Sequence, residues 1–243
     1  MGERVATILS VTAFLFLLFV VPCFAAEKHD TPGTAEARRR MVALLKEKYD
    51  IHDEKILEVM GRVPRHLFVP EHQRKNAYED RPLPIGYGQT ISQPAMVAYM
   101  TQLARIDGTS KVLEIGSGSG YQAAVLAETA EAVFTVEIIP ELARRAEENL
   151  RRTGYGNVKV RQGDGYYGWP EEAPFDAIVV TAAAPHIPPP LMDQLEDGGR
   201  MIIPVGSPYR TQHLVLVERE GSEFRTQTLM PVRFVPLVRP EEP

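Results

Sequence analysis

From residue 111 onward, short apolar runs alternate with longer segments whose apolar residues recur at helical spacing. The apolar runs predict strands over 111–115, 132–136, 158–162, 175–180 and 200–205, and the segments between them predict helices near 120–128, 140–152 and 188–195. This alternation predicts a doubly wound α/β fold, in which helices cover both faces of a mostly parallel sheet. Two later runs, 213–218 and 224–236, are joined through Glu220 and Gly221. They predict a hairpin that ends a seven-stranded sheet antiparallel.

The chain before residue 105 is predicted to be mainly helical. Its apolar spacing predicts helices over 34–49, 53–60 and 94–104. We expect Gly61 to stop the second helix, and Ser92 to cap the third, which Pro94 opens. Residues 34–243 then form one domain. Within it, residues 34–104 make a helical cover over the cofactor side, and residues 105–243 hold the cofactor-binding sheet and the C-terminal hairpin.

The first 26 residues have the pattern of a secretory signal. Residues 8–21 are almost entirely apolar, an arginine precedes them, and Ala25 and Ala26 supply small residues at the end. We therefore expect export, to the periplasm, after cleavage near Ala25 or Ala26, with residues 27–33 as a linker. Because the apolar stretch is short for a membrane span, an uncleaved membrane anchor is the alternative.

Composition narrows the possible partners. The 243-residue chain has a net charge of −5 and a pI near 5.8, so no basic field favours nucleic acid or an anionic membrane. Arg38, Arg39 and Arg40 form the one local basic run, and we expect them to form a solvated helix face. Cys23 is the only cysteine and lies in the predicted signal, so the mature chain has no thiol nucleophile. The six histidines are scattered and predict no metal site.

Candidate chemistry begins at the first strand of the sheet. Gly116, Gly118 and Gly120 follow this strand directly, and a helical run follows them. Such a turn lets a ligand lie against bare backbone, next to the unpaired N–H groups of a helix N-terminus. The next strand ends at Glu137, where a carboxylate can accept hydrogen bonds from both ribose hydroxyls. Together these features predict a nucleoside-containing cofactor at the carboxyl end of the sheet.

The glycine spacing separates the possible cofactors. A dinucleotide fingerprint needs G-x-G-x-x-G, but here the third glycine comes one residue early. With Glu114 ahead of the first glycine, the E-x-G-x-G-x-G loop resembles the first motif of S-adenosylmethionine-dependent methyltransferases. From the loop alone, a dinucleotide site and a purely structural turn stay open. Gly163, Asp164 and Gly165 follow the third strand, where Asp164 can accept from an adenine amino group; a plain tight turn is the alternative.

A second candidate binding segment precedes the third predicted helix. Residues 84–94 combine two glycines, hydroxyl and amide side chains and a helix-opening proline, a pattern typical of anion binding. This G-Q-T-I-S-x-P block closely resembles that of protein-L-isoaspartate O-methyltransferases. Other blocks of that family occur in order at 63–70, 112–121, 163–165, 173–178, 182–185, 195–206 and 234–237. The resemblance covers about residues 36–237. The predicted export signal departs from it, because the family is usually cytoplasmic.

The resemblance implies a Rossmann-like methyltransferase fold and an activity. The implied reaction transfers a methyl group from S-adenosyl-L-methionine, leaving S-adenosyl-L-homocysteine, to the free α-carboxylate of L-isoaspartyl residues in damaged proteins. The ester then re-closes to a succinimide without the enzyme. Ser92 matches the family's active-site serine, and we expect it to position the substrate carboxylate. The implied cofactor pocket comprises Gln89, Thr90, Ile91, Glu114, Gly116, Ser117, Gly118, Glu137, Ile138, Asp164 and Gly165.

The implied chemistry needs no general base, because a carboxylate is already ionised at neutral pH. The missing histidine or cysteine constellation is therefore consistent with it. Two other functions stay open: methylation of a different carboxylate or small molecule on the same scaffold, and a non-catalytic protein that binds damaged polypeptides. The expected partners are isoaspartyl proteins and peptides, with no nucleic acid and no stable membrane insertion after signal cleavage. The expected oligomeric state is a monomer.

Overall fold

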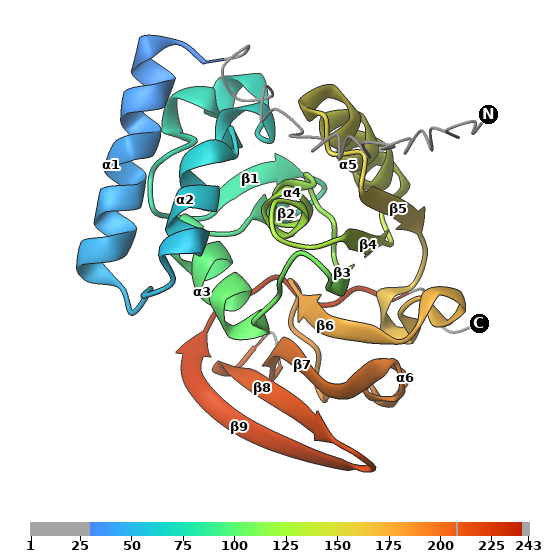
Figure 1. Ribbon diagram of the computed structural model, residues 1–243. Helices are drawn as coiled ribbons and strands as arrows, with labels where there is room; N and C mark the ends of the chain where they lie inside the picture. The colour runs from blue at the N-terminus through green and yellow to red at the C-terminus, as the bar shows by residue number, and fades with distance from the viewer. Residues whose placement is uncertain (1–29, 208, 240–243) are drawn as a thin grey trace, which may run out of the picture.

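The computed structural model describes residues 30–207 and 209–239. The predicted signal, residues 1–26, and the first residues of the predicted linker lie outside this part. The described chain contains a seven-stranded sheet in the order β5-β4-β3-β6-β7-β8-β9 and a separate two-stranded hairpin, β1-β2 (Figure 1). The strands are β1 Leu83–Gly86, β2 Gln89–Ile91, β3 Lys111–Ile115, β4 Ala132–Glu137, β5 Val158–Gln162, β6 Phe175–Val180, β7 Leu195–Val205, β8 Gln212–Glu220 and β9 Glu223–Val232.

Helices flank the sheet. They are α1 Pro32–Lys48, α2 Glu54–Arg62, α3 Pro94–Ala104, α4 Tyr121–Ala127, α5 Pro140–Thr153 and α6 Pro189–Asp193. Short 3-10 helices occur at η1 Arg65–Leu67, η2 Glu71–Asn76, η3 Gly165–Tyr167 and η4 Pro170–Glu172. The predicted doubly wound sheet is confirmed: β5, β4, β3, β6 and β7 run parallel to one another, β8 pairs antiparallel with β7, and β9 pairs antiparallel with β8.

The position of β3 determines where a ligand can bind. From β3 the chain continues to β4 and β5 on one side, and then crosses to β6 on the other side. The carboxyl ends of β3 and β6 therefore flank the point where the winding reverses, which is where open α/β sheets bind their ligands.

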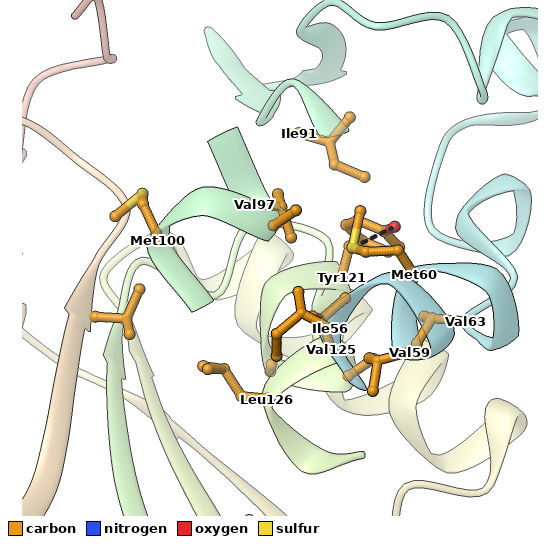
Figure 2. Packing of buried hydrophobic residues seen from close by; sticks show 14 of the residues in the cluster. Ile56, Val59, Met60, Val63, Ile91, Val97, Met100, Tyr121, Val125 and Leu126 are labelled. Carbon is orange, nitrogen blue, oxygen red and sulfur yellow. Dashed lines mark hydrogen bonds between the residues drawn. The ribbon is translucent and has the colours of Figure 1, made fainter. Parts of the chain in front are cut away.

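Alternate residues of each strand face two separate cores. Val112 of β3 packs into the core that α1 to α5 share with the sheet, whereas its neighbour Leu113 packs into the core that includes Leu191 of α6. Figure 2 shows the first core between α2, α3 and α4, where Met60, Val97 and Tyr121 converge. This packing fixes α4, which follows the glycine loop, and α3, which follows Ser92.

Three local predictions for the helical cover were wrong. Helix α2 continues through Gly61 and ends at Arg62, because the next residue, Val63, precedes Pro64 and adopts an extended conformation. Arg38 is not solvated: it is 7% exposed, pairs with Asp30 and donates from Nε to the carbonyl of Gly61. Buried charges require such partners.

Ser92 does not cap α3, which is the third correction. The capping position belongs to Gln93, whose side chain makes no capping bond. Instead, Oδ1 of Asp80 accepts from the backbone N–H of Ala95 at 3.0 Å, supplying an acceptor in the first turn. The Ser92 hydroxyl has no hydrogen bond within the described residues, so it is available to a ligand.

Candidate active site

The glycine loop is packed against the strand that follows the crossover. Gly116 has a φ of +96°, and a Cβ there would lie 2.5 Å from Oγ1 of Thr181. That hydroxyl lies 2.7 Å from the carbonyl oxygen of Gly116 and donates to it. Both the left-handed backbone and the missing side chain are therefore required for Thr181 to close on the loop.

Glu137 holds the loop from the other side. Its Oε2 accepts from the backbone N–H of Gly118 at 2.8 Å, and its Oε1 accepts from that of Ile139 at 3.0 Å. The side chain is largely buried at the carboxyl end of β4. Each carboxylate oxygen has a further lone pair, so Glu137 can shape the loop and still accept from a ligand hydroxyl.

Seven of the predicted cofactor residues line one cavity of about 50 Å³. These are Gln89, Thr90, Gly116, Gly118, Glu137, Ile138 and Gly165. Gly165 is as constrained as Gly116, since a Cβ there would lie 2.4 Å from the side chain of Ile115. The opposite wall is the segment from Val235 to Val238, which the sequence did not place here. A carboxylate, bare backbone and apolar side chains suit a nucleoside.

Asp164 does not line this cavity. Its Oδ1 accepts from the N–H of Tyr166 at 2.9 Å, and its Oδ2 lies 3.1 Å from Nε of Arg239. The Arg239 guanidinium also lies 4.2 Å from the centre of the Tyr166 ring. Asp164 thus caps η3 and ties the C-terminal segment to it, and its role toward an adenine stays a prediction. It lies one residue from Gly165, which does line the cavity.

The three predicted cofactor residues that remain, Ile91, Glu114 and Ser117, line a second cavity of about 30 Å³. Thr90, Gly116, Gly118 and Ser92 also line it. Glu114 has no exposed surface; its Oε2 accepts from Oγ1 of Thr135 at 2.5 Å, and its Oε1 has no hydrogen-bond partner among the described residues. Burial, with the negative charge of Glu137, raises the pKa of Glu114 to about 8. At neutral pH the Glu114 carboxyl is therefore largely protonated.

A groove of about 690 Å³ adjoins these two cavities and contains Ser92. Thr90 and Thr181 line all three spaces, so the spaces meet at this pair of residues. The remaining walls of the groove come from the start of α3 and from the end of β9 with the segment after it. One ligand in the 50 Å³ cavity and another in the groove would face each other at the two threonines.

The segment that carries Ser92 is supported from behind. Arg65, which has no exposed surface, donates from Nη2 to the carbonyl of Ser92 at 2.7 Å and from Nε to that of Ala77 at 2.8 Å. Burial lowers the pKa of Arg65 to about 10, so it stays protonated at neutral pH. Oδ2 of Asp80 accepts from Nε2 of Gln93 at 2.9 Å, one residue further along.

Residues 30–207 and 209–239 contain no group of three or more His, Cys, Asp or Glu side chains arranged to hold a metal ion. Within the same residues, no helix has both the length and the apolar character needed to span a bilayer.

Residues 36–242 match the family described as protein-L-isoaspartate(D-aspartate) O-methyltransferase (PCMT). The chain belongs to this family. It is 62% identical over 186 residues to protein-L-isoaspartate O-methyltransferase 2 of Syntrophobacter fumaroxidans, covering 76% of this chain and 75% of the relative. It is 50% identical over 228 residues to the Shewanella sediminis enzyme of the same name, covering 92% and 93% of the two chains.

A solved structure also resembles this PCMT chain. It is that of a Plasmodium falciparum protein described as a beta-aspartate methyltransferase (PCMT), in complex with S-adenosyl-L-homocysteine. The two share 28% identity with a TM-score of 0.72, over 83% of this chain and 98% of the other. The sheet and its flanking helices therefore form the S-adenosylmethionine-dependent methyltransferase fold.

Sequence reasoning missed several residues of this PCMT site. Thr181 directly follows β6, at the strand end beside the glycine loop, and that position was a usable signal. Arg65 lies in a proline-flanked loop, where an arginine usually faces solvent, so its burial gave no signal. The C-terminal wall depends on contacts with residues far away in the chain, including the bond from Ala183 N–H to Val235 carbonyl at 2.8 Å.

Proposed function

We propose that this protein transfers a methyl group from S-adenosyl-L-methionine to the α-carboxylate of L-isoaspartyl residues in damaged proteins and peptides. Membership of the PCMT family supports the activity, and the relative in complex with S-adenosyl-L-homocysteine supports the cofactor. The junction of two cavities at Thr90 and Thr181 is the observation that carries the proposal for this chain.

The cofactor cavity suits this donor. S-adenosylmethionine supplies an electrophilic methyl group on a sulfonium. Glu137 would accept from the ribose hydroxyls, Ile138 would pack on the adenine, and the glycine loop would allow close approach of the methionine part. Gly165 lines the same cavity and would lie beside the adenine. Asp164 would accept from the adenine amino group only through lone pairs not used by Tyr166 and Arg239.

The groove suits an anionic nucleophile that needs positioning rather than activation. A substrate carboxylate is ionised at neutral pH, so no group has to remove a proton from it. A tight ion pair would stabilise the carboxylate and weaken it as a nucleophile, whereas neutral donors hold it at lower cost. The unbonded hydroxyl of Ser92 is such a donor, and Thr90 stands between it and the cofactor cavity. The protonated state of Glu114 keeps a second negative charge away from this carboxylate.

Methyl transfer to matched peptides tests the function. Two peptides of identical composition, one with L-isoaspartate and one with normal aspartate, would be incubated with the protein and S-adenosylmethionine labelled on the methyl group. We expect base-labile label on the isoaspartyl peptide alone. Cofactor binding with no label on either peptide would instead favour another acceptor on the same fold. Peptide binding without cofactor binding would favour a non-catalytic role.

The proposal extends to where the protein acts. The charged, apolar and small-residue pattern of residues 1–26 supports export and cleavage near Ala25 or Ala26, and the enzyme would then act as a monomer in the periplasm. Cell fractionation and the mass of the recovered protein test this. Protein that stays in the membrane fraction at full length would favour the anchored alternative. A species of twice the mass in solution would contradict the monomer.

A further inference from the structure

The groove next to Ser92 carries a single charged side chain among its twelve lining residues. This residue is Arg233, one position beyond the end of β9. The other lining residues are neutral: Pro82, Thr90, Ser92, Gln93, Met96, Thr181, Met230, Pro231, Val232, Phe234 and Val235. An extended polypeptide entering this groove would therefore meet apolar and hydroxyl groups and one positive charge.

The chain holds Arg233 in place through its neighbour. Gln212, which is 2% exposed, accepts from the N–H of Phe234 through Oε1 at 2.6 Å and donates from Nε2 to its carbonyl at 3.1 Å. The Phe234 side chain packs against the larger core, while Arg233 is exposed at the groove. The backbone on which Arg233 stands is thus fixed by a buried amide, and only the arginine side chain has to be ordered by a ligand.

The Arg233 charge is not used within the fold. Its guanidinium makes no hydrogen bond or ion pair with residues 30–207 or 209–239, in contrast to Arg200, which pairs with Glu218 on the same sheet. An arginine with no carboxylate partner keeps its five donors for a ligand, and a carboxylate is the group that these donors match best.

Resting on the proposed function, we propose that Arg233 is a specificity-determining residue. It selects isoaspartyl sites that have an aspartate or glutamate side chain nearby in the same polypeptide. The reacting carboxylate itself is not its partner, because it is held beside Thr90 and Ser92 and must stay nucleophilic. The flanking acid supplies binding energy in the groove, away from the reacting atoms.

A charge-swap experiment tests this. Isoaspartyl peptides carrying glutamate, glutamine or lysine at one flanking position, on either side of the damaged residue, would be methylated by the wild type, Arg233→Gln and Arg233→Glu. The wild type should prefer the glutamate peptide over the lysine peptide, by roughly two- to fivefold in kcat/KM for each exposed ion pair formed or lost. Arg233→Gln should abolish the preference, and Arg233→Glu should invert it. High salt should weaken the wild-type preference.

The matched control is Arg151→Gln. Arg151 is exposed in the last turn of α5 and lines none of the three spaces, so this variant loses the same charge elsewhere. It should keep the wild-type preference. On the glutamine peptide, Arg151→Gln should give the wild-type kcat/KM.

Two results would overturn the inference while the methyltransferase stands. If Arg233→Gln lowers kcat/KM equally on all three peptides, Arg233 holds the reacting carboxylate or the fold instead. If the wild type methylates the glutamate and lysine peptides equally well, the groove does not select substrates by the charge of the flanking residue. Failure to methylate any isoaspartyl peptide would instead defeat the proposed function itself, so the two failures are distinct.

Discussion

Nη2 of Arg65 donates a hydrogen bond to the backbone carbonyl of Ser92 across 2.7 Å, from a guanidinium with no exposed surface. The same guanidinium lies 4.7 Å from the centre of the Tyr121 ring. Tyr121 packs in the core between α2, α3 and α4 (Figure 2). The position of the Ser92 backbone is therefore tied to the packed interior, although Ser92 also lines the groove.

Replacing Arg65 should impair turnover through Ser92. Arg65→Met leaves the carbonyls of Ser92 and Ala77 without their donor, which should lower the free energy of unfolding by about 2 kcal/mol or more. Among molecules that remain folded, kcat should fall while the Kd for S-adenosylmethionine is kept. Arg65→Lys, which keeps the charge and one donor direction, should recover part of kcat.

Arg38→Met is the matched control for losing a buried arginine. It removes the bonds to Gly61 and Tyr78 and the pair with Asp30. Arg38 lines none of the three spaces, so the variant should lower Tm and leave kcat per folded molecule unchanged. An equal loss of kcat in the two variants would show that Arg65 acts only through stability.

Ser92→Ala should lower kcat more than it changes cofactor affinity. A hydrogen bond to a charged group contributes about 1.5–3 kcal/mol, which corresponds to roughly a tenfold to hundredfold loss in rate. Steady-state kinetics and calorimetric titration of the cofactor separate the two effects. Ser110 directly precedes β3, at the end of the strand away from the glycine loop. Ser110→Ala should therefore leave kcat and cofactor affinity at wild-type values. If Ser92→Ala lowers cofactor affinity as much as kcat, Ser92 does not act by positioning the substrate carboxylate.

Glu137 supports the glycine loop, and we propose that it also binds the ribose; substitutions can separate these two roles. Glu137→Ala removes both acceptors of the loop N–H groups, so Tm and cofactor affinity should fall together. Glu137→Gln keeps one acceptor and the side-chain shape, so it should weaken cofactor binding with a smaller loss of Tm. Unchanged cofactor affinity in both variants would contradict the proposed contact of Glu137 with the ribose.

Gly116 should tolerate a side chain less well than Gly118. At Gly116 an added Cβ meets Thr181 at 2.5 Å, whereas at Gly118, with a φ of +52°, it meets Ile85 at 3.3 Å. Gly116→Ala should therefore cost about 1–3 kcal/mol of stability from strained backbone and also abolish cofactor binding. Chemical denaturation of both variants measures the difference. Equal stability of the two variants would contradict the close approach of Thr181.

The proton on Glu114 predicts a pH dependence of stability. Its native pKa of about 8 lies above the ordinary value of 4.5. Between these values the native state holds a proton that the unfolded chain has released, so the Glu114 contribution to stability is lost as pH rises through the window. Glu114→Gln has no such proton. The Tm of the variant relative to wild type should rise steadily from about pH 5 to about pH 8. A difference that stays constant would show that Glu114 is ionised in the native state.

Local patterns explain why part of this structure could be predicted. The buried strands of the sheet are apolar runs bounded by turns, and the glycine loop follows one of them, so both are visible in the sequence. The β1-β2 hairpin was missed because its strands are only four and three residues long, and β1 contains Pro84. Ser92 was given a cap role because local rules cannot show that Asp80, twelve residues earlier, supplies that acceptor.

Following one isoaspartyl peptide by mass spectrometry, with the protein and S-adenosylmethionine present, tests the central claim most directly. We expect a methyl ester to form first, a succinimide to follow as methanol is lost, and the normal aspartyl peptide to accumulate at the expense of the starting peptide. Ser92→Ala should delay the first step alone. An unchanged isoaspartyl peptide, with the cofactor shown to bind, would contradict the account.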